Sequence, residues 1–226
     1  MDPYTTVVFD LDGTLLDTLA DLEASVNHAL AQAHLPARTT DEVRLFTGNG
    51  IRRLIERSVN EDREHPADAS TVEAVLEEFK RHYAAHCQDH TAPYPGVIEL
   101  VDHLKHAGVR VAVVSNKADF AVQELVERQF PGTFDCVLGE REEAGIRKKP
   151  APDMVNVALE RMGGERAGLV YVGDSEVDVQ TAQNVGCSCL SCSWGFRERD
   201  WLVRAGATTI VDTPTELERV LLAGAV

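Results

Sequence analysis

The chain has 226 residues, of which 44% are hydrophobic and 26% charged, proportions typical of a globular protein. Its formal net charge of −15 argues against nucleic acid or an anionic membrane as a partner, because both are bound through basic surfaces. Five cysteines fit a reducing compartment better than a disulfide framework, and no secretory or membrane-spanning pattern is evident. We therefore expect a cytoplasmic protein, monomeric or homodimeric, that draws an anionic ligand in through a local cation cluster or a metal.

The first apolar run predicts a strand that is buried on both faces, since Val7, Val8 and Phe9 show no polar alternation. Gly13 breaks this strand, so Asp10 and Asp12 stand at its carboxyl end, where open α/β sheets bind ligands. Two carboxylates so close repel each other unless one is protonated or a cation lies beside them. Mg²⁺ is such a cation, although a strand followed by an ordinary Asp-Gly turn would show the same letters.

From Asp17 to Cys87 the apolar residues recur at helical spacing, and no strand-like run appears. Residues 19–30 carry one apolar stripe, a second helix is predicted to begin at Thr40, and a third follows Ser70, a candidate capping residue. The polar segment 61–69 is predicted to be a loop. We interpret the whole span as a small helical insertion.

Strand signals return in the second half of the chain, at residues 109–114, 136–138, 169–172, 187–193 and 208–211. Helical patterns lie between these runs, and alternating β and α segments predict a doubly wound parallel sheet with helices on both faces. The sequence therefore predicts an α/β, Rossmann-like core formed by residues 1–16 and 90–226. Residues 17–89 form the predicted α-helical domain, inserted after the first strand.

Acidic, hydroxyl and amino groups follow separate predicted strands or precede a predicted helix, at Asp10, Asp12, Ser115, Lys149, Asp174 and Asp178. Because the carboxyl ends of neighbouring parallel strands meet at one edge, we expect these groups to converge. Taken singly, Ser115 could be a turn former, Lys149 a solvated charge and Asp178 a first-turn helix acid. Asp174 is harder to explain away, since an acid after a buried apolar run must be hydrogen-bonded or bound to a metal.

In this order the segments resemble the four motifs of the haloacid dehalogenase (HAD) superfamily of phosphatases: DxDGT, a serine ending the second strand, a lysine before proline, and GDxxxD. The resemblance covers nearly the whole chain. It implies that Asp10 is the nucleophile, which becomes an aspartyl phosphate, and that Asp12 is the general acid that later activates water. It also implies two ligand sets: Thr14, Ser115, Asn116 and Lys149 for phosphate, and Asp10, Asp174 and the Asp12 carbonyl for Mg²⁺.

Two further roles follow from the same resemblance. Asp178 is expected to support the metal site through water or through Lys149. Lys148 competes for the lysine role, and we favour Lys149 because it directly precedes Pro150. The chemistry agrees with these assignments, because a carboxylate can attack a phosphate dianion only if the like charges are neutralised by a metal and a lysine.

The position of the helical insertion resembles the cap of the α-helical-cap HAD subgroup, in which the cap closes over the active site. Within it, residues 47–53 resemble the cap segment of phosphoglycolate phosphatases. The expected substrate contacts are Gly48, Asn49, Gly50 and Arg53, with the arginine holding a carboxylate. A glycine-rich helix start with exposed arginines explains the same residues and stays open as an alternative. Trp194–Arg197 also resembles that branch.

Two other patterns are interpreted as structural. Cys187, Cys189 and Cys192 could bind zinc, but they fall on a predicted strand, and we favour buried strand residues. The histidines at positions 82, 86 and 90 recur every fourth residue, which would align them on a helix face. Prolines follow at positions 93 and 95, so we favour a solvated face or a hinge.

The expected function is that of a Mg²⁺-dependent hydrolase, a phosphatase acting on a small phosphorylated metabolite with phosphoglycolate as the first candidate. A phosphosugar mutase resembling β-phosphoglucomutase, or a pyrophosphatase, could use the same catalytic aspartates. A non-catalytic scaffold is disfavoured because no motif residue is missing. Haloacid dehalogenation is disfavoured because Asp12 and the metal-binding acids would have no task.

Overall fold

The computed structural model describes residues 4–60 and 66–223. These residues fall into two compact units. One unit, the core, holds the residues up to Leu16 and those from Pro93 onward, and the other holds the residues between Asp17 and Ala92. The second unit is therefore a single insertion into the sequence of the first.

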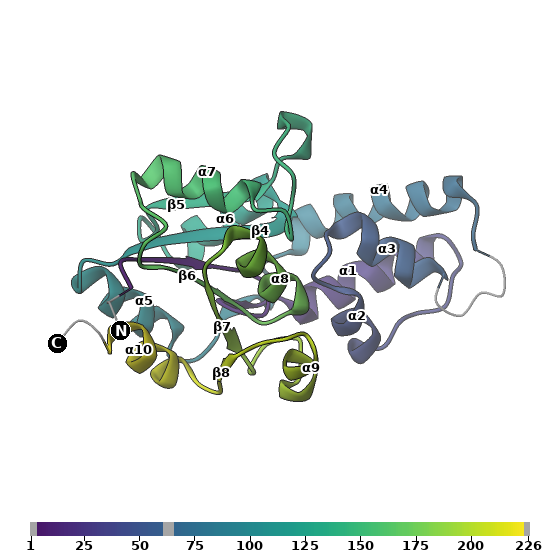
Figure 1. Cartoon of the computed structure of the whole chain (residues 1–226). Helices are drawn as coiled ribbons and strands as arrows, with labels where there is room; N and C mark the ends of the chain where they lie inside the picture. The colour runs from purple at the N-terminus through teal and green to yellow at the C-terminus, as the bar shows by residue number, and fades with distance from the viewer. Residues whose placement is uncertain (1–3, 61–65, 224–226) are drawn as a thin grey trace. The chain divides into compact units, whose positions relative to one another are not determined.

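The core contains a six-stranded parallel sheet in the order β5-β4-β1-β6-β7-β8 (Figure 1). Its strands are β1 (Thr6–Phe9), β4 (Arg110–Ala118), β5 (Cys136–Glu140), β6 (Leu169–Gly173), β7 (Ser188–Cys192) and β8 (Thr209–Val211). β1 lies in the middle, paired with β4 on one side and β6 on the other. This central position explains why all four of its residues are buried, and it confirms the predicted α/β fold.

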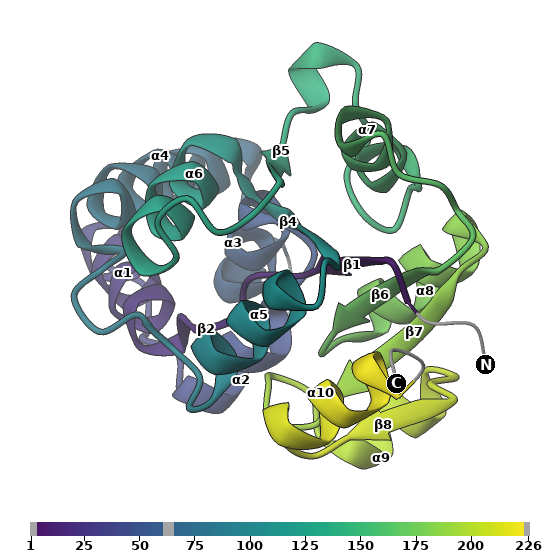
Figure 2. The ribbon, with the colours of Figure 1, turned by 90° about the vertical axis from the view of Figure 1, so that its left-hand side faces the viewer.

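Helices cover both faces of this sheet. They are α5 (Val97–His106), α6 (Asp119–Gln129), α7 (Asp153–Met162), α8 (Glu176–Val185), α9 (Arg199–Arg204) and α10 (Pro214–Leu222). Figure 2 shows α7 and α8 on one side of the sheet, with α5, α6 and α10 on the other. A short 3₁₀ helix, Glu142–Ala144, lies between β5 and α7.

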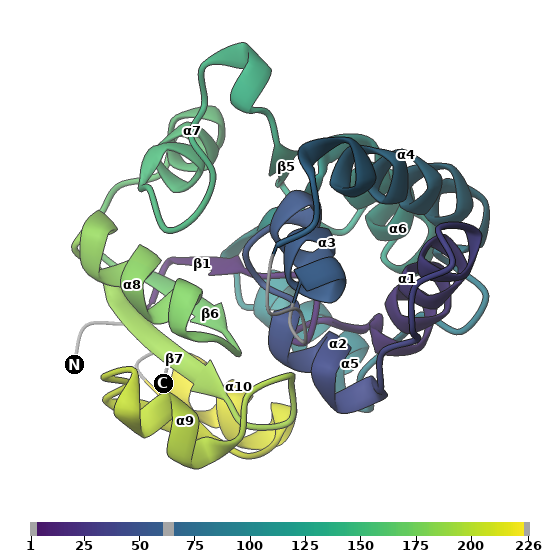
Figure 3. The ribbon, with the colours of Figure 1, turned by 90° about the vertical axis from the view of Figure 1, so that its right-hand side faces the viewer.

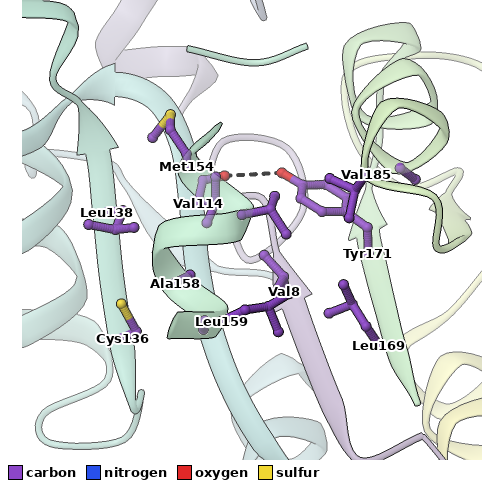
Figure 4. Close-up of a cluster of buried hydrophobic side chains, with 13 residues drawn as sticks. Val8, Val114, Cys136, Leu138, Met154, Ala158, Leu159, Leu169, Tyr171 and Val185 are labelled. Carbon is purple, nitrogen blue, oxygen red and sulfur yellow. Dashed lines mark hydrogen bonds between the residues drawn. The ribbon is translucent and has the colours of Figure 1, made fainter. Parts of the chain in front are cut away.

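Apolar side chains of the sheet pack against α7 and α8. Val8, Leu138 and Tyr171 from the strands contact a cluster that includes Met154 of α7, and the Tyr171 hydroxyl donates to the Val114 carbonyl at 3.1 Å (Figure 4). The buried tyrosine therefore has a partner for its polar atom. The hydrogen bond links β6 to β4 across the intervening β1, and with the apolar packing it holds the carboxyl ends of the central strands in place.

The insertion is helical, as predicted. It contains α1 (Leu19–Gln32), α2 (Thr40–Phe46), α3 (Ile51–Asn60) and α4 (Ala69–His86). Figure 3 shows α1 running alongside α4, and the apolar stripe predicted for α1 is buried. A two-stranded sheet of β2 (Leu16–Asp17) and β3 (Ala92–Pro93) pairs the segments where the chain enters and leaves the insertion.

The predicted helix start at Ser70 is wrong. Asp68 is the N-cap of α4, and its carboxylate accepts from the Thr71 backbone amide at 2.7 Å, while the Ser70 hydroxyl donates to the same carboxylate. The charged oxygen is the better acceptor for a free helix amide, so the cap moves two residues earlier. Of the predicted loop, residues 61–65 lie outside the described residues.

The cysteine pattern runs along β7, and the histidine pattern spans the end of α4. Cys189 and Cys192 lie on β7, as favoured, while Cys187 directly precedes the strand; burial raises the pKa of the Cys192 thiol. α4 ends at His86, so His90 lies beyond the helix, where its ring contacts the Asp21 carboxylate at 2.9 Å. Among the described residues, no helix has the length and apolar character needed to cross a bilayer.

Candidate active site

Asp10 and Asp178 share the ammonium group of Lys149. Asp10 directly follows β1, and its Oδ1 lies 2.8 Å from Lys149 Nζ, which lies equally far from Asp178 Oδ1. All three side chains are buried, and the second Asp178 oxygen accepts from the backbone amide and hydroxyl of Ser175 at the start of α8. The structure thus places Asp178 against Lys149, one of the two ways in which it is expected to support a metal site, and that support stays a prediction.

Asp174 follows β6 and is enclosed by hydrogen-bond donors. Its Oδ1 accepts from the Thr14 hydroxyl at 3.1 Å, and its Oδ2 accepts from the Phe196 backbone amide at 2.6 Å. Two glycines make room for this carboxylate. A Cβ atom on Gly13, whose φ is +85°, would lie 2.4 Å from Asp174 Oδ2, and one on Gly195 would lie 2.4 Å from the Asp174 Cβ. No other residue type fits either position without displacing the carboxylate.

The electrostatics of this edge favour a cation. The pKa of Asp10 is raised to about 7, chiefly by burial; Lys149 opposes the rise, and the Asp178 and Asp12 charges contribute to it. Burial and the neighbouring carboxylates also raise the pKa of Asp174 well above its usual range. For Lys149, burial favours the neutral amine, but Asp10 and Asp178 outweigh it and the pKa rises. The aspartates therefore compete for too little positive charge, the situation that a bound divalent ion relieves.

The carboxylates fit a magnesium ion. Oxygen atoms of Asp10, Asp174 and Asp178 all lie within 4.8 Å of one another, and carboxylate oxygens are the ligands that Mg²⁺ prefers. The cradle formed by Gly13 and Gly195 fixes one of these carboxylates. As the resemblance implies, Asp10 and Asp174 are the residues that would hold the ion, and Asp178, whose Oδ1 lies 2.8 Å from Lys149 Nζ, would support them.

The structure places the expected phosphate-binding residues at the same edge of the sheet. Ser115 is buried at a register shift of β4, where its hydroxyl accepts from the Lys117 backbone amide at 3.2 Å. The Asn116 side chain contacts the backbone of Lys149, donating to its carbonyl at 3.0 Å and accepting from its amide at 2.8 Å. Lys148, the competing lysine, instead pairs with Glu140 at 3.2 Å. The phosphate contacts themselves stay predictions.

Sequence reasoning missed a second buried lysine. Lys117 Nζ lies 2.7 Å from Asp12 Oδ1, and only 4% of the lysine side chain is exposed. The two aspartates that the sequence marks as repelling each other thus each have an ammonium group as a neighbour. The available signal was the spacing of Ser115 and Lys117, two residues apart after a buried strand, although no local pattern reveals a contact between residues 105 positions apart.

The predicted substrate residues of the insertion lie around the start of α3. Gly48 and Gly50 have φ angles of +114° and +87°, a conformation that glycine adopts without strain. Arg53 is exposed and pairs with Glu56 at 3.0 Å, and the neighbouring Arg52 pairs with Glu73. A contact of Gly48, Asn49, Gly50 or Arg53 with substrate stays a prediction.

The comparison with protein families decides the class. The family described as haloacid dehalogenase-like hydrolase matches residues 7–192, which include the aspartates, lysines and Ser115 of the site. The chain belongs to this family of hydrolases.

Its similarity to individual proteins extends over most of its length. The hydrolase is 36% identical to a phosphoglycolate phosphatase from Caulobacter vibrioides, over 85% of this chain and 81% of that protein. It is 31% identical to one from Agrobacterium fabrum, over 96% and 94%. A crystal structure from Lactobacillus delbrueckii, of a protein described as a candidate phosphoglycolate phosphatase, superposes with a TM-score of 0.92 at 40% identity, covering 97% of this chain and 98% of that one. The hydrolase is therefore phosphoglycolate phosphatase-like.

The segment after β7 completes the hydrolase site. The Phe196 amide binds Asp174, and the Trp194 indole donates to the Thr14 carbonyl at 3.1 Å. Both residues lie in the sequence Trp194–Arg197, which resembles the phosphoglycolate phosphatase branch, but no sequence pattern places a backbone donor there. The contact depends on the turn that Gly195 allows, which only the folded chain shows.

Proposed function

We propose that this hydrolase is a Mg²⁺-dependent phosphomonoesterase that acts on a small phosphorylated metabolite through an aspartyl phosphate, with phosphoglycolate as the first candidate. The observation that carries the proposal is the buried Asp10 carboxylate, held between Lys149 and the other aspartates at the carboxyl edge of a parallel sheet. The phosphoglycolate phosphatases of Caulobacter and Agrobacterium support the choice of substrate.

In the first half of the reaction, a carboxylate oxygen of Asp10 attacks phosphorus and the bond between phosphorus and the ester oxygen breaks. Asp12 gives its proton to that departing oxygen, so an alcohol leaves. Lys149 holds the phosphoryl group together with Ser115, and it keeps the Asp10 carboxylate facing the reacting phosphorus. Mg²⁺ bound by Asp10 and Asp174 would neutralise part of the negative charge that opposes this attack.

In the second half, water attacks the phosphorus of the aspartyl phosphate. Asp12, now ionised, takes the proton from the water, and the bond between phosphorus and Asp10 breaks to release inorganic phosphate. The Lys117 ammonium group, 2.7 Å from Asp12, stabilises the ionised carboxylate that this step needs. Such positioned acid–base catalysis typically contributes about 10²–10⁴-fold.

The helical insertion has a proposed part in this function. We propose that residues 17–89 act as a cap domain and that Gly48, Asn49, Gly50 and Arg53 read the leaving group. The glycine conformations at the start of α3 support close backbone approach to a ligand, and Arg53 supplies an exposed cation. Both features are also compatible with an ordinary helix start.

Phosphate release tests the proposal. The purified protein is incubated with phosphoglycolate, β-glucose 1-phosphate and pyrophosphate, each with Mg²⁺ or with EDTA, and with Asp10→Asn as the control variant. We expect release from phosphoglycolate only with Mg²⁺ and only when Asp10 is present. Phosphorylation of the protein by the substrate, with loss of the phosphoryl group in mild base, would identify the aspartyl phosphate.

The other outcomes of this experiment separate the alternatives. Isomerisation of the sugar phosphate without phosphate release would identify a mutase, and release from pyrophosphate alone would identify a pyrophosphatase. Full activity of Asp10→Asn would refute the assigned nucleophile. Inertness towards every phosphorylated compound would refute the proposed function.

A further inference from the structure

In the proposed reaction Lys117 stabilises the ionised Asp12 carboxylate, and its position beside the leaving oxygen allows a second role. Lys149, Ser115 and the metal-binding carboxylates surround the phosphoryl group, while Lys117 lies against Asp12, the residue assigned to the leaving oxygen. Its side chain is almost completely buried, with 4% exposed, and Asp12 is 14% exposed. A buried ammonium group loses several kcal/mol of hydration and persists only where anions compensate it. Asp12 supplies such an anion, and the same ammonium group lies beside the position of the leaving oxygen.

The charge balance of the site points the same way. Lys149 lies between two carboxylates, Asp10 and Asp178, and Lys117 lies 2.7 Å from the third, Asp12. A protein with a formal net charge of −15 repels anions at long range, so a negatively charged leaving group needs a fixed cation within the site. In the core, that cation would have to lie next to the acid that protonates the leaving oxygen, which is where Lys117 lies.

We propose that Lys117 is a specificity-determining residue, whose ammonium group binds a carboxylate carried by the leaving group on the carbon next to the ester oxygen. This inference rests on the proposed phosphatase function and narrows its substrate class to phosphate monoesters of 2-hydroxy carboxylates. In such a substrate one carbon atom separates the ester oxygen from the substrate carboxylate. When the ester oxygen lies within hydrogen-bond reach of Asp12, the Lys117 ammonium, 2.7 Å from Asp12, is within reach of the substrate carboxylate as well.

The inference differs from the role expected of the insertion. The sequence assigned carboxylate binding to Arg53, which is exposed and paired with Glu56. Lys117 is held by the end of β4, a rigid part of the core, and its backbone amide is fixed by Ser115. A charged group whose side chain is held by a rigid element discriminates better between substrates than one on a flexible, exposed side chain, because it loses less conformational freedom when the substrate binds.

A matched pair of substrates tests this proposal. Phosphoglycolate and ethyl phosphate are both phosphate monoesters, but ethyl phosphate has a methyl group where phosphoglycolate has its carboxylate. The ratio of kcat/KM for the two is measured for the wild type, Lys117→Met, Lys117→Gln and Lys117→Arg, with Lys148→Met as the control. We expect Lys117→Met to lower the ratio by about 100-fold, the effect of removing one partner of a buried charge pair. Lys117→Arg should keep most of the preference and Lys148→Met all of it.

Lys117→Gln guards against a folding defect, because its amide can still donate to Asp12 while the charge is lost; it should lower the ratio as Lys117→Met does. Equal losses on both substrates in the Lys117 variants would overturn the proposal and leave Lys117 a partner of Asp12 only. A wild type that hydrolyses both substrates equally well would overturn it too, while the phosphatase function would stand. A wild type that releases phosphate from neither would overturn both.

Discussion

Replacing Asp10 by asparagine should make the fold less sensitive to alkaline pH. Both hydrogen bonds to Asp10 Oδ1, from the Leu11 amide at 2.7 Å and from Lys149 at 2.8 Å, can be accepted by the amide oxygen of an asparagine. The substitution therefore keeps the local geometry and removes only the ability to ionise. It separates the cost of a buried charge from the cost of altered packing.

The magnitude follows from the shifted pKa. Burial raises the pKa of Asp10 from 3.8 to about 7, and about three pKa units at 1.36 kcal/mol each make its ionisation in the folded state cost about 4 kcal/mol. Because the folded state binds this proton more tightly than the unfolded chain, the stabilisation is complete below pH 3.8 and is lost as the pH rises to about 7. Between pH 5 and 8 the loss is about 2.5 kcal/mol.

The assay is urea unfolding of the wild type and Asp10→Asn at several values between pH 5 and 8, with EDTA present. The free energy of unfolding of the wild type, minus that of the variant, should fall by about 2.5 kcal/mol over this range. Terms that do not depend on pH cancel in this comparison. Asp200→Asn, at an exposed carboxylate, is the control and should follow the wild type within about 0.5 kcal/mol.

Magnesium should reverse the loss in the wild type. At pH 8 and a concentration about 100 times its dissociation constant, Mg²⁺ should raise the free energy of unfolding by about 2.7 kcal/mol, and by less in Asp10→Asn. Parallel pH profiles of the two proteins would refute the argument, because they would mean that Asp10 is not forced to ionise against its surroundings. A magnesium effect of equal size in both proteins would remove Asp10 from the metal site.

Two other substitutions test the ion pairs and the insertion. Lys149→Met should lower the free energy of unfolding by about 3–5 kcal/mol at pH 7, because it leaves buried carboxylates without their cation. The control Lys148→Met should lower the free energy of unfolding by less than about 1 kcal/mol. Equal losses in the two lysine variants would contradict the assignment of Lys149 as the buried partner of the carboxylates. In Asp21, burial raises the pKa, but hydrogen bonds from Thr91 and His90 outweigh it and the pKa is lowered. The resulting stability is present at neutral pH and lost as the pH falls through that lowered pKa. Asp21→Asn should therefore cost about 1–3 kcal/mol at pH 7 and less near pH 3, as measured by urea unfolding.

The sequence predicts the parts of the fold that depend on local patterns. Val7, Val8 and Phe9 predict the central strand because a strand covered on both faces needs no polar residue, and the apolar stripe of α1 predicts its buried face. Helix starts are harder, since Asp68 and Ser70 are both good caps and their competition depends on the conformation that the chain takes before α4. The short helix α9, Arg199–Arg204, has too few turns to show a period.

The candidate site divides in the same way. The carboxyl ends of parallel strands converge by topology, so Asp10, Ser115 and Asp174 could be placed at one edge from the order of strands alone. The contacts between individual side chains could not be predicted in this way, because they depend on the positions of the side chains in the folded protein. Lys117 and Asp12 are an example, as is the amide of Phe196, whose contact with Asp174 requires a turn around Gly195.

The side chain of Asn116 behaves as a substitute peptide unit. Its amide nitrogen and oxygen bind the carbonyl and the amide of Lys149 at once, the same donor and acceptor pair that a neighbouring strand would offer. Asn116 makes this contact from within β4, at the interruption of its ladder with β5 between Val114 and Ala118. An aspartate has nearly the same shape but no N–H to donate, so it would face the Lys149 carbonyl with a second acceptor and tilt the residue that carries the ammonium group.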